Sequence, residues 1–146
     1  MSENKAKDKR IERINKLLKE RKLDEALEIT EVSDVEDWFV LGAWLGEHEV
    51  HDEAGKIFDR ITQLDPNHVD AWSKKGVALG VLGKYDEAIE CFDKAIEINP
   101  NHADAWYHKG IALENLEKQD EARECIEKAI EIDPRYGMTS RWGPRY

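Results

Sequence analysis

The residues that most often carry chemistry in proteins, cysteine and histidine, are few in this chain. Its two cysteines, Cys91 and Cys125, stand 34 residues apart at equivalent places in a repeated pattern. Helices that stack side by side hold such positions about 10 Å apart, which is too far for a disulfide. We expect both thiols to be small core side chains in a reducing compartment.

Histidine spacing offers a metal ion only one pair of ligands. His48 and His51 lie close together in the sequence, but no cysteine or second histidine pair accompanies them, whereas zinc sites use three or four protein ligands. The sequence therefore predicts no metal site. His68 and His102 each follow an asparagine in a turn, and we expect them to be exposed turn residues.

Patterns typical of catalysis are also absent from the sequence. The chain contains no glycine-rich phosphate loop, nucleophile elbow or Ser/His/Asp pattern. Aspartate and glutamate are abundant, but they fall on predicted helix faces and at helix starts, where solvation and the helix dipole account for them. We predict a protein that is not an enzyme, with no catalytic residues and no cofactor.

The elements that position these residues repeat every 34 residues. Trp38, Trp72 and Trp106 mark the period. A fixed period of this length is typical of a solenoid, in which each unit buries its apolar face against its neighbours. Four other residue types recur in register with the tryptophans, at Gly42, Gly76, Gly110, Leu45, Leu79, Leu113, Ala54, Ala88, Ala122, Pro66, Pro100 and Pro134.

Each unit is predicted to be a pair of helices. Apolar residues recur with helical spacing over 70–83, Gly83 begins the turn, and a second helix follows until a proline ends it. Gly76 costs about 1 kcal/mol inside the first helix, so we expect it to permit close approach of the second helix near Ala88. Trp72 is expected to be a core aromatic residue of the same pair.

These signature positions give the chain a resemblance to the tetratricopeptide repeat (TPR) family, whose unit is a helix-turn-helix of this length. The resemblance implies an all-α fold, a right-handed α-solenoid of antiparallel helix pairs, with three full repeats at 35–68, 69–102 and 103–136. Residues 1–34 are predicted to be a degenerate helical pair with a shortened second helix that covers one end of the stack. Residues 137–146 form a basic, aromatic C-terminal tail. We expect one continuous domain.

Charge and hydropathy exclude several classes of partner. The net charge is −10 at pH 7, and residues 24–134 carry ten Lys/Arg against twenty-eight Asp/Glu. Such an acidic body is unsuited to nucleic acid, because phosphate contacts need clustered Lys/Arg. No apolar run approaches the length that crosses a bilayer, and the charged amino terminus does not resemble a signal peptide. We expect a cytoplasmic protein that binds neither nucleic acid nor membrane.

The resemblance also implies a binding surface. In the family, the first helices of successive repeats line a concave groove that holds a peptide or a helix of a partner. Spacings of three and four between the groove positions place their side chains on one helix face. In this chain the implied groove residues are Glu36, Phe39, Ala43, Asp70, Ser73, Val77, Asp104, Tyr107, His108, Ile111 and Asn115.

The chemistry of this surface predicts its partner. Its acids, Glu36, Asp70 and Asp104, suit a basic or amphipathic peptide segment with aromatic side chains. Some family members clamp the acidic carboxyl terminus of heat-shock chaperones with lysine, asparagine and arginine. That set is missing at the corresponding positions here, so we expect no tight binding of such a tail. The predicted function is a non-catalytic protein–protein interaction adaptor.

The C-terminal tail supports an alternative function. Glycine and proline interrupt the segment after Pro134, so no full capping helix is predicted and the last repeat lacks its usual cover. Four outcomes stay open: a disordered tail, a tail folded back on the end, pairing of two chains, or docking in the groove. The alternative is a structural module that forms a homo-oligomer through this end. The tail residues suited to an acidic groove are Arg141, Trp142, Arg145 and Tyr146.

Overall fold

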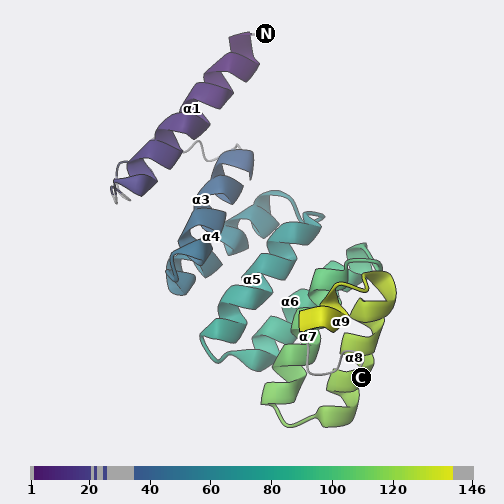
Figure 1. Cartoon of the computed structure of the whole chain (residues 1–146). Coiled ribbons are helices and arrows are strands. Elements are labelled where there is room, and N and C mark those ends of the chain that lie inside the picture. The colour runs from purple at the N-terminus through teal and green to yellow at the C-terminus, as the bar shows by residue number, and fades with distance from the viewer. Residues whose placement is uncertain (1, 21, 23–24, 26–34, 140–146) are drawn as a thin grey trace. The chain divides into compact units, whose positions relative to one another are not determined.

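A computed structural model of the chain describes residues 2–20, 22, 25 and 35–139. All regular elements among these residues are helices (Figure 1), which confirms the predicted all-α class. None of the described helices is both long enough and apolar enough to span a lipid bilayer. The chain divides into two compact units, residues 1–66 and 67–146, and each is described by itself. A single continuous domain therefore stays a prediction.

The first unit joins an N-terminal helix to a helix pair. Its helices are α1 (Ser2–Lys19), α3 (Val35–Glu47) and α4 (His51–Leu64). Helix α1 packs against α3, where Arg10 forms an ion pair with Asp37, whose side chain is fully buried. Ile14 of α1 is also fully buried. The predicted shortened second helix of the N-terminal pair begins in the segment 23–27 and ends before a joint at 32–34. Apart from residue 25, it lies outside the described residues.

The second unit is a stack of antiparallel helices. It contains α5 (Val69–Val81), α6 (Tyr85–Ile98), α7 (Ala103–Asn115), α8 (Gln119–Ile132) and the single turn α9 (Tyr136–Thr139). Each helix from α5 to α8 packs against the next along the chain (Figure 1). This arrangement confirms that the repeated sequence pattern encodes helix pairs.

The turns inside the three pairs share one backbone conformation. Glu49, Gly83 and Glu117 have positive φ values of 61°, 81° and 63°. The residue after each donates its N–H to a carbonyl five residues earlier, as Lys84 does to Leu79 at 2.9 Å. This pattern is a Schellman cap, in which a left-handed residue ends the helix and satisfies its last carbonyls. Glycine occupies the left-handed position only in the turn between α5 and α6.

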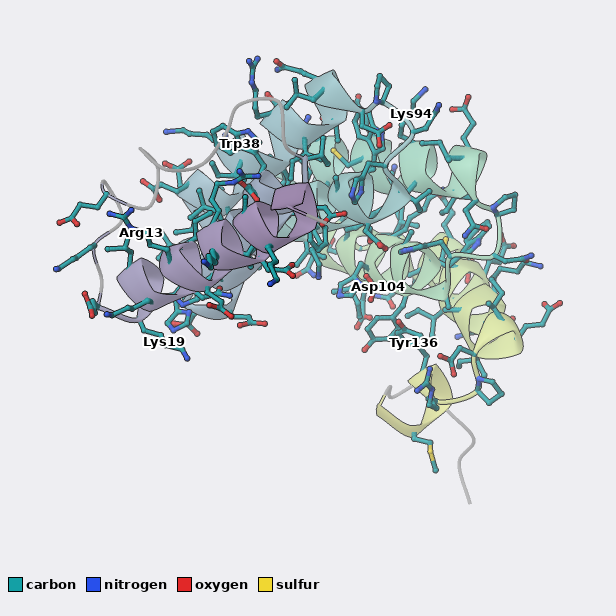
Figure 2. The ribbon with its side chains drawn as sticks, turned by 90° about the horizontal axis from the view of Figure 1, so that it is seen from above. Arg13, Lys19, Trp38, Lys94, Asp104 and Tyr136 are labelled. Carbon is teal, nitrogen blue, oxygen red and sulfur yellow. The ribbon has the colours of Figure 1, made fainter. Side chains whose placement is uncertain are left out.

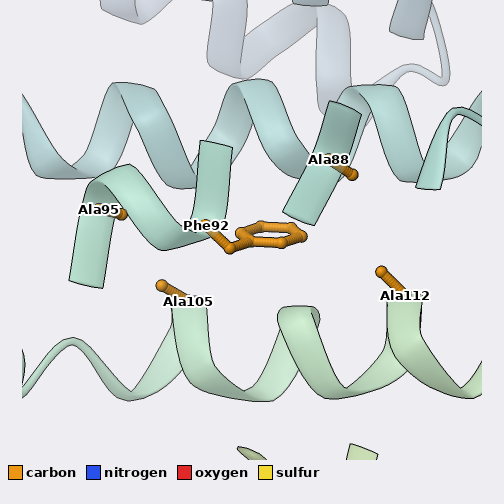
Figure 3. Packing of buried hydrophobic residues seen from close by; sticks show 5 residues of the cluster. All are labelled: Ala88, Phe92, Ala95, Ala105 and Ala112. Carbon is orange, nitrogen blue, oxygen red and sulfur yellow. The ribbon is translucent and has the colours of Figure 1, made fainter. Parts of the chain in front are cut away.

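One buried core cluster of the second unit lies between α6 and α7, and another lies between α7 and α8. Phe92 is 1% exposed and its ring is surrounded by four alanines, Ala88, Ala95, Ala105 and Ala112 (Figure 3). Trp72 is only half-buried and packs against this cluster, so the prediction that Trp72 is a core aromatic residue was wrong. Small residues on both helices leave one ring-sized space, and the phenylalanine fills it.

The structure confirms that helices approach closely at the repeated glycines, although the residue that faces Gly76 differs from the predicted one. A Cβ added at Gly76 would lie 2.6 Å from the Phe92 ring, so the neighbour is Phe92 rather than the predicted Ala88. At Gly110 an added Cβ would lie 2.5 Å from Ile126 and 3.1 Å from the carbonyl oxygen of Ala122. Both glycines therefore allow the second helix of their pair to pack directly on the first.

The two cysteines are buried and are not joined in a disulfide, as predicted. Cys91 is 5% exposed and Cys125 is 6% exposed. Burial raises the pKa of the Cys125 thiol, and Lys109 opposes that rise only in part. Both side chains act as small apolar groups on the second helices of their pairs.

Candidate functional site

The predicted groove residues lie on helices of both units. In the first unit, Glu36 is exposed, and Phe39 and Ala43 are half-buried on α3. The ring of Phe39 packs edge-on against Phe58, with centroids 5.9 Å apart. A groove that runs continuously from these residues into the second unit stays a prediction.

In the second unit, α5 and α7 bring most of the remaining predicted residues together. Helix α5 supplies Asp70, Ser73 and Val77, and α7 supplies Asp104, Tyr107, His108, Ile111 and Asn115. The helical spacing of three to four residues puts each set on one face. Two features result: a hydrogen-bond network around Asp104 and an apolar hollow beside it.

Asp104 is the centre of the hydrogen-bond network. Its carboxylate accepts from the Ser73 hydroxyl at 3.1 Å and from the Tyr136 hydroxyl at 3.1 Å. Nδ1 of His108 lies 3.3 Å from the same carboxylate. The labelled side chains of Asp104 and Tyr136 lie near each other in Figure 2. Asp104 is therefore already paired with three donors, one on its own helix and two on α5 and α9, so its negative charge is partly compensated within the protein.

The network shifts the pKa values of its members so that Asp104 is kept negatively charged and His108 positively charged. Burial alone would raise the pKa of Asp104, but the hydrogen bond and charge of His108, with the two hydroxyls, hold it well below its ordinary value. Burial would lower the pKa of His108, and the hydrogen bond and charge of Asp104 raise it instead. Burial and the nearby Asp104 raise the pKa of Tyr136 to about 12. Each direction favours an ionised Asp104 beside a protonated His108.

Ser73, Asp104 and His108 do not form a nucleophilic triad. Such a triad needs the histidine between the serine and the carboxylate. Here the Ser73 hydroxyl donates to Asp104 directly, and Ser73 is only 1% exposed. The serine thus stabilises the orientation of the Asp104 carboxylate through this hydrogen bond. Among the described residues, no group of three or more His, Cys, Asp or Glu side chains has the arrangement of a metal site.

Asp70 repeats part of this arrangement one repeat earlier. His102 Nε2 lies 3.0 Å from the Asp70 carboxylate, and His102 Nδ1 accepts from the backbone N–H of Ala105 at 3.2 Å. His102 therefore caps the start of α7 and donates to Asp70 through its other nitrogen. His68 caps α5 in the same way. The prediction that both histidines are exposed turn residues was wrong, since both are partly buried and their rings cap helices.

The apolar hollow lies beside the network and has a volume of about 170 Å³. Phe92 of α6 lines it together with side chains of α5 and α7, and three polar side chains, Tyr85, His108 and Asn115, also line it. Asn115 donates to the Ile111 carbonyl at 2.9 Å. The predicted groove residues in the lining are Val77, His108, Ile111 and Asn115, joined by Gly76, Gly80, Val81 and Ala112. A mostly apolar hollow with a few polar groups is typical of a ligand site.

Sequence reasoning missed Tyr136, His102 and Phe92. Tyr136 and His102 are the last residues of their repeats, and each contacts an acidic residue 32 positions earlier. Pairing the last residue of each repeat with its second residue in the sequence could have identified both contacts. Phe92 is one of several apolar residues with helical spacing in its repeat, and the spacing alone does not distinguish it from the others. The predicted tail residues Arg141, Trp142, Arg145 and Tyr146 lie outside the described residues.

Comparisons with known proteins agree with this architecture. The sequence model of the family described as tetratricopeptide repeat matches residues 69–102 and 103–136. No curated protein sequence matches the chain.

Solved structures share the fold over most of the chain. A crystal structure of MamA is 23% identical with a TM-score of 0.73, and covers 90% of this chain and 80% of that chain. A MamA fragment from Desulfovibrio magneticus RS-1 is 25% identical, with the same TM-score and coverage. The first TPR of Spaghetti (RPAP3), bound to the HSP90 peptide SRMEEVD, is 21% identical with a TM-score of 0.67, and covers 72% of this chain and 83% of that chain. The helix pairs, the two matched repeats and these neighbours together show an α-solenoid fold that contains tetratricopeptide repeats at residues 69–102 and 103–136.

Proposed function

We propose that the protein is a non-catalytic adaptor that binds an amphipathic segment of a partner protein on the second unit. The observation that carries this proposal is the apolar hollow between α5, α6 and α7. An apolar cavity of about 150 Å³ holds a molecule of benzene size, so a hollow of about 170 Å³ fits one leucine, methionine or phenylalanine side chain. One inserted side chain gives a weak but specific anchor for a longer segment.

Charge around the hollow supports an amphipathic partner rather than a strongly basic one. Asp70 has a 64% exposed side chain and can receive one basic residue of the partner. Among the described residues, Asp70 is hydrogen-bonded to His102 alone. Asp104, in contrast, is paired with His108 and two hydroxyls and is less exposed, at 39%. Asp70 is therefore the more accessible of the two predicted groove acids in this unit. Val81, which lines the hollow, is 58% exposed and extends the apolar surface outward.

The relatives support peptide binding only by analogy. The first TPR of Spaghetti (RPAP3) is bound to an HSP90 peptide. From this we propose that the present chain also binds a peptide segment, but one of a different sequence. The lysine, asparagine and arginine that clamp such acidic tails in some family members are missing here, so we do not expect this chain to bind that peptide.

Leucine substitutions at two glycines test the proposal. A Cβ at Gly80 lies 4.0 Å from Ala88 and one at Gly46 meets nothing within 4 Å, so both helices accept a side chain. Gly80 lines the hollow and Gly46 does not. Peptides selected from a random displayed library by the full chain should share an apolar residue. They should bind Gly46→Leu normally and bind Gly80→Leu at least tenfold more weakly. Equal binding to Gly80→Leu would refute the hollow as the site.

Self-association through the uncapped C-terminal repeat and the basic, aromatic tail of residues 137–146 stays the alternative. Light scattering after size exclusion, on the full chain and on a chain ending at Thr139, separates the two functions. An oligomer that becomes a monomer on truncation would favour assembly, and a monomer in both cases would favour the adaptor.

A further inference from the structure

His108 stands between the hollow and the Asp104 network. Its ring lines the hollow and lies nearly parallel to Phe92, with centroids 6.0 Å apart and planes at 26°. The His108 side chain is 31% exposed. A group that enters the hollow therefore meets both the apolar face of Phe92 and the imidazole of His108.

The hydrogen bonds of His108 determine what its two nitrogens can do. Nδ1 lies 2.8 Å from the backbone carbonyl oxygen of Asp104 and 3.3 Å from its carboxylate. Both groups only accept, so Nδ1 carries a proton whether the ring is neutral or charged. Nε2 has no hydrogen-bond partner among the described residues. It is an acceptor in the neutral ring and a donor in the cation.

Charged and polar groups on several helices act on this imidazole. Asp104, on the same helix, raises the pKa of His108, and Lys74 on α5 lowers it. Ser73 on α5 and Tyr136 on α9 both donate to Asp104 and keep that carboxylate ionised. Tyr85 on α6 lines the same hollow, and Tyr107 packs edge-on against the ring at 5.4 Å. The balance of these groups favours the cation, and thus a donor at Nε2.

Within the binding function proposed above, we propose that the hollow selects an apolar side chain whose neighbouring carbonyl oxygen accepts a hydrogen bond from Nε2 of His108. The apolar group fills the space over Phe92, and the carbonyl replaces water at the ring edge. When His108 is neutral, Nε2 carries a lone pair that repels the same carbonyl. Recognition of this ligand class therefore depends on the protonation of a single histidine.

The experiment uses N,N-dimethyl-4-methylpentanamide as the probe. This molecule joins a branched chain of leucine size to a tertiary amide, which accepts hydrogen bonds and donates none. The full chain is titrated with the probe across a pH series, and amide NMR shifts of Gly76, Gly80 and Ala112 report occupancy. The ring signals of His108 report its own titration in the same samples. Affinity should fall about tenfold as His108 loses its proton, the typical effect of a hydrogen bond from a charged group.

Three variants separate the two proposals. His108→Phe keeps an aromatic ring beside Phe92 and should give a flat pH profile. Asp104→Asn should move the titration of His108 to lower pH and move the binding profile with it. Flat profiles for both the unsubstituted chain and His108→Phe, with Gly80→Leu still abolishing binding, would overturn the role of His108 and leave the adaptor function intact. No binding by the unsubstituted chain, or equal binding by Gly80→Leu, would overturn both.

Discussion

The Tyr136 hydroxyl donates to the Asp104 carboxylate at 3.1 Å, across the same 32 residues that separate His102 from its acid, Asp70. The last residue of each of these repeats thus contacts the second residue of the same repeat. In the final repeat a tyrosine replaces the histidine, and its ring also packs against Tyr107 with centroids 5.0 Å apart. This contact fixes the start of α9 on α7, beside the residues that line the hollow.

Removal of the Tyr136 hydroxyl should weaken the fold without disturbing the ring packing. Tyr136→Phe keeps the contact with Tyr107 and should lower the free energy of unfolding by about 1 kcal/mol, the usual net value of one hydrogen bond. Urea unfolding followed by circular dichroism measures the change. Tyr85→Phe is the matched control, because the Tyr85 hydroxyl has no hydrogen bond among the described residues, and this variant should unfold like the unsubstituted chain. An equal loss in both variants would count against the Asp104 contact.

Loss of the Asp104 charge should lower the pKa of His108. Asp104→Asn keeps the shape of the side chain but removes the charge whose attraction opposes desolvation of the imidazole. An NMR titration of the His108 ring should show the shift directly. If the ring titrates at the same pH in both proteins, the two side chains do not interact in solution.

The same pair predicts how stability depends on pH. The pKa of Asp104 is lowered in the folded chain, so its stabilisation is present above the ordinary value of 3.8 and is lost as pH falls toward the folded value. The pKa of His108 is raised, so its stabilisation is present below 6.5 and is lost as pH rises through the folded value. The advantage of the unsubstituted chain over Asp104→Asn should be largest between these limits. Denaturant midpoints at pH 5 and well above the His108 titration test this.

How far the sequence could predict the structure is clear from particular residues. The period of 34 and the spacing of apolar residues were enough for the helix pairs, because each repeated position faces the same neighbour. Ser73 shows where this reasoning stops. It was placed on the correct helix face as a small groove residue, but it is buried and donates to Asp104. The repeat period predicts on which helix face a residue lies. It does not predict what covers that face, which here depends on how α7 packs and on the contact that Tyr136 makes with Asp104.

Two aromatic substitutions should differ in cost because the two rings differ in burial. Phe92 is 1% exposed between α6 and α7, so Phe92→Ala should lower the free energy of unfolding by about 3–5 kcal/mol. Trp72 is half-buried and packs against the same cluster, and Trp72→Ala should cost less. Thermal and urea unfolding of both variants provide the comparison. A larger loss for Trp72→Ala would restore the prediction of a tryptophan core.

Alanine at the helical glycines should separate tight positions from open ones. Gly110→Ala brings a Cβ against Ile126 and against the backbone oxygen of Ala122, and the overpacking should cost about 1–3 kcal/mol. Gly46→Ala and Gly80→Ala meet no close atom and should each stabilise by up to about 1 kcal/mol through helix propensity. Urea midpoints of the three variants give the order directly. A stabilising Gly110→Ala would mean that α7 and α8 are farther apart than the structure shows.

Glycine should be the better residue at the left-handed turn positions. Glu117 has φ of 63°, a conformation that costs a residue with a Cβ about 1 kcal/mol relative to glycine. Glu117→Gly should therefore stabilise the fold by nearly that amount, reduced by the greater freedom of glycine in the unfolded chain. Gly83→Ala, at the equivalent turn with φ of 81°, should destabilise for the same reason. Urea unfolding of both variants decides the matter. If the two substitutions shift the midpoint in the same direction, the turns differ in solution and the shared Schellman cap does not hold.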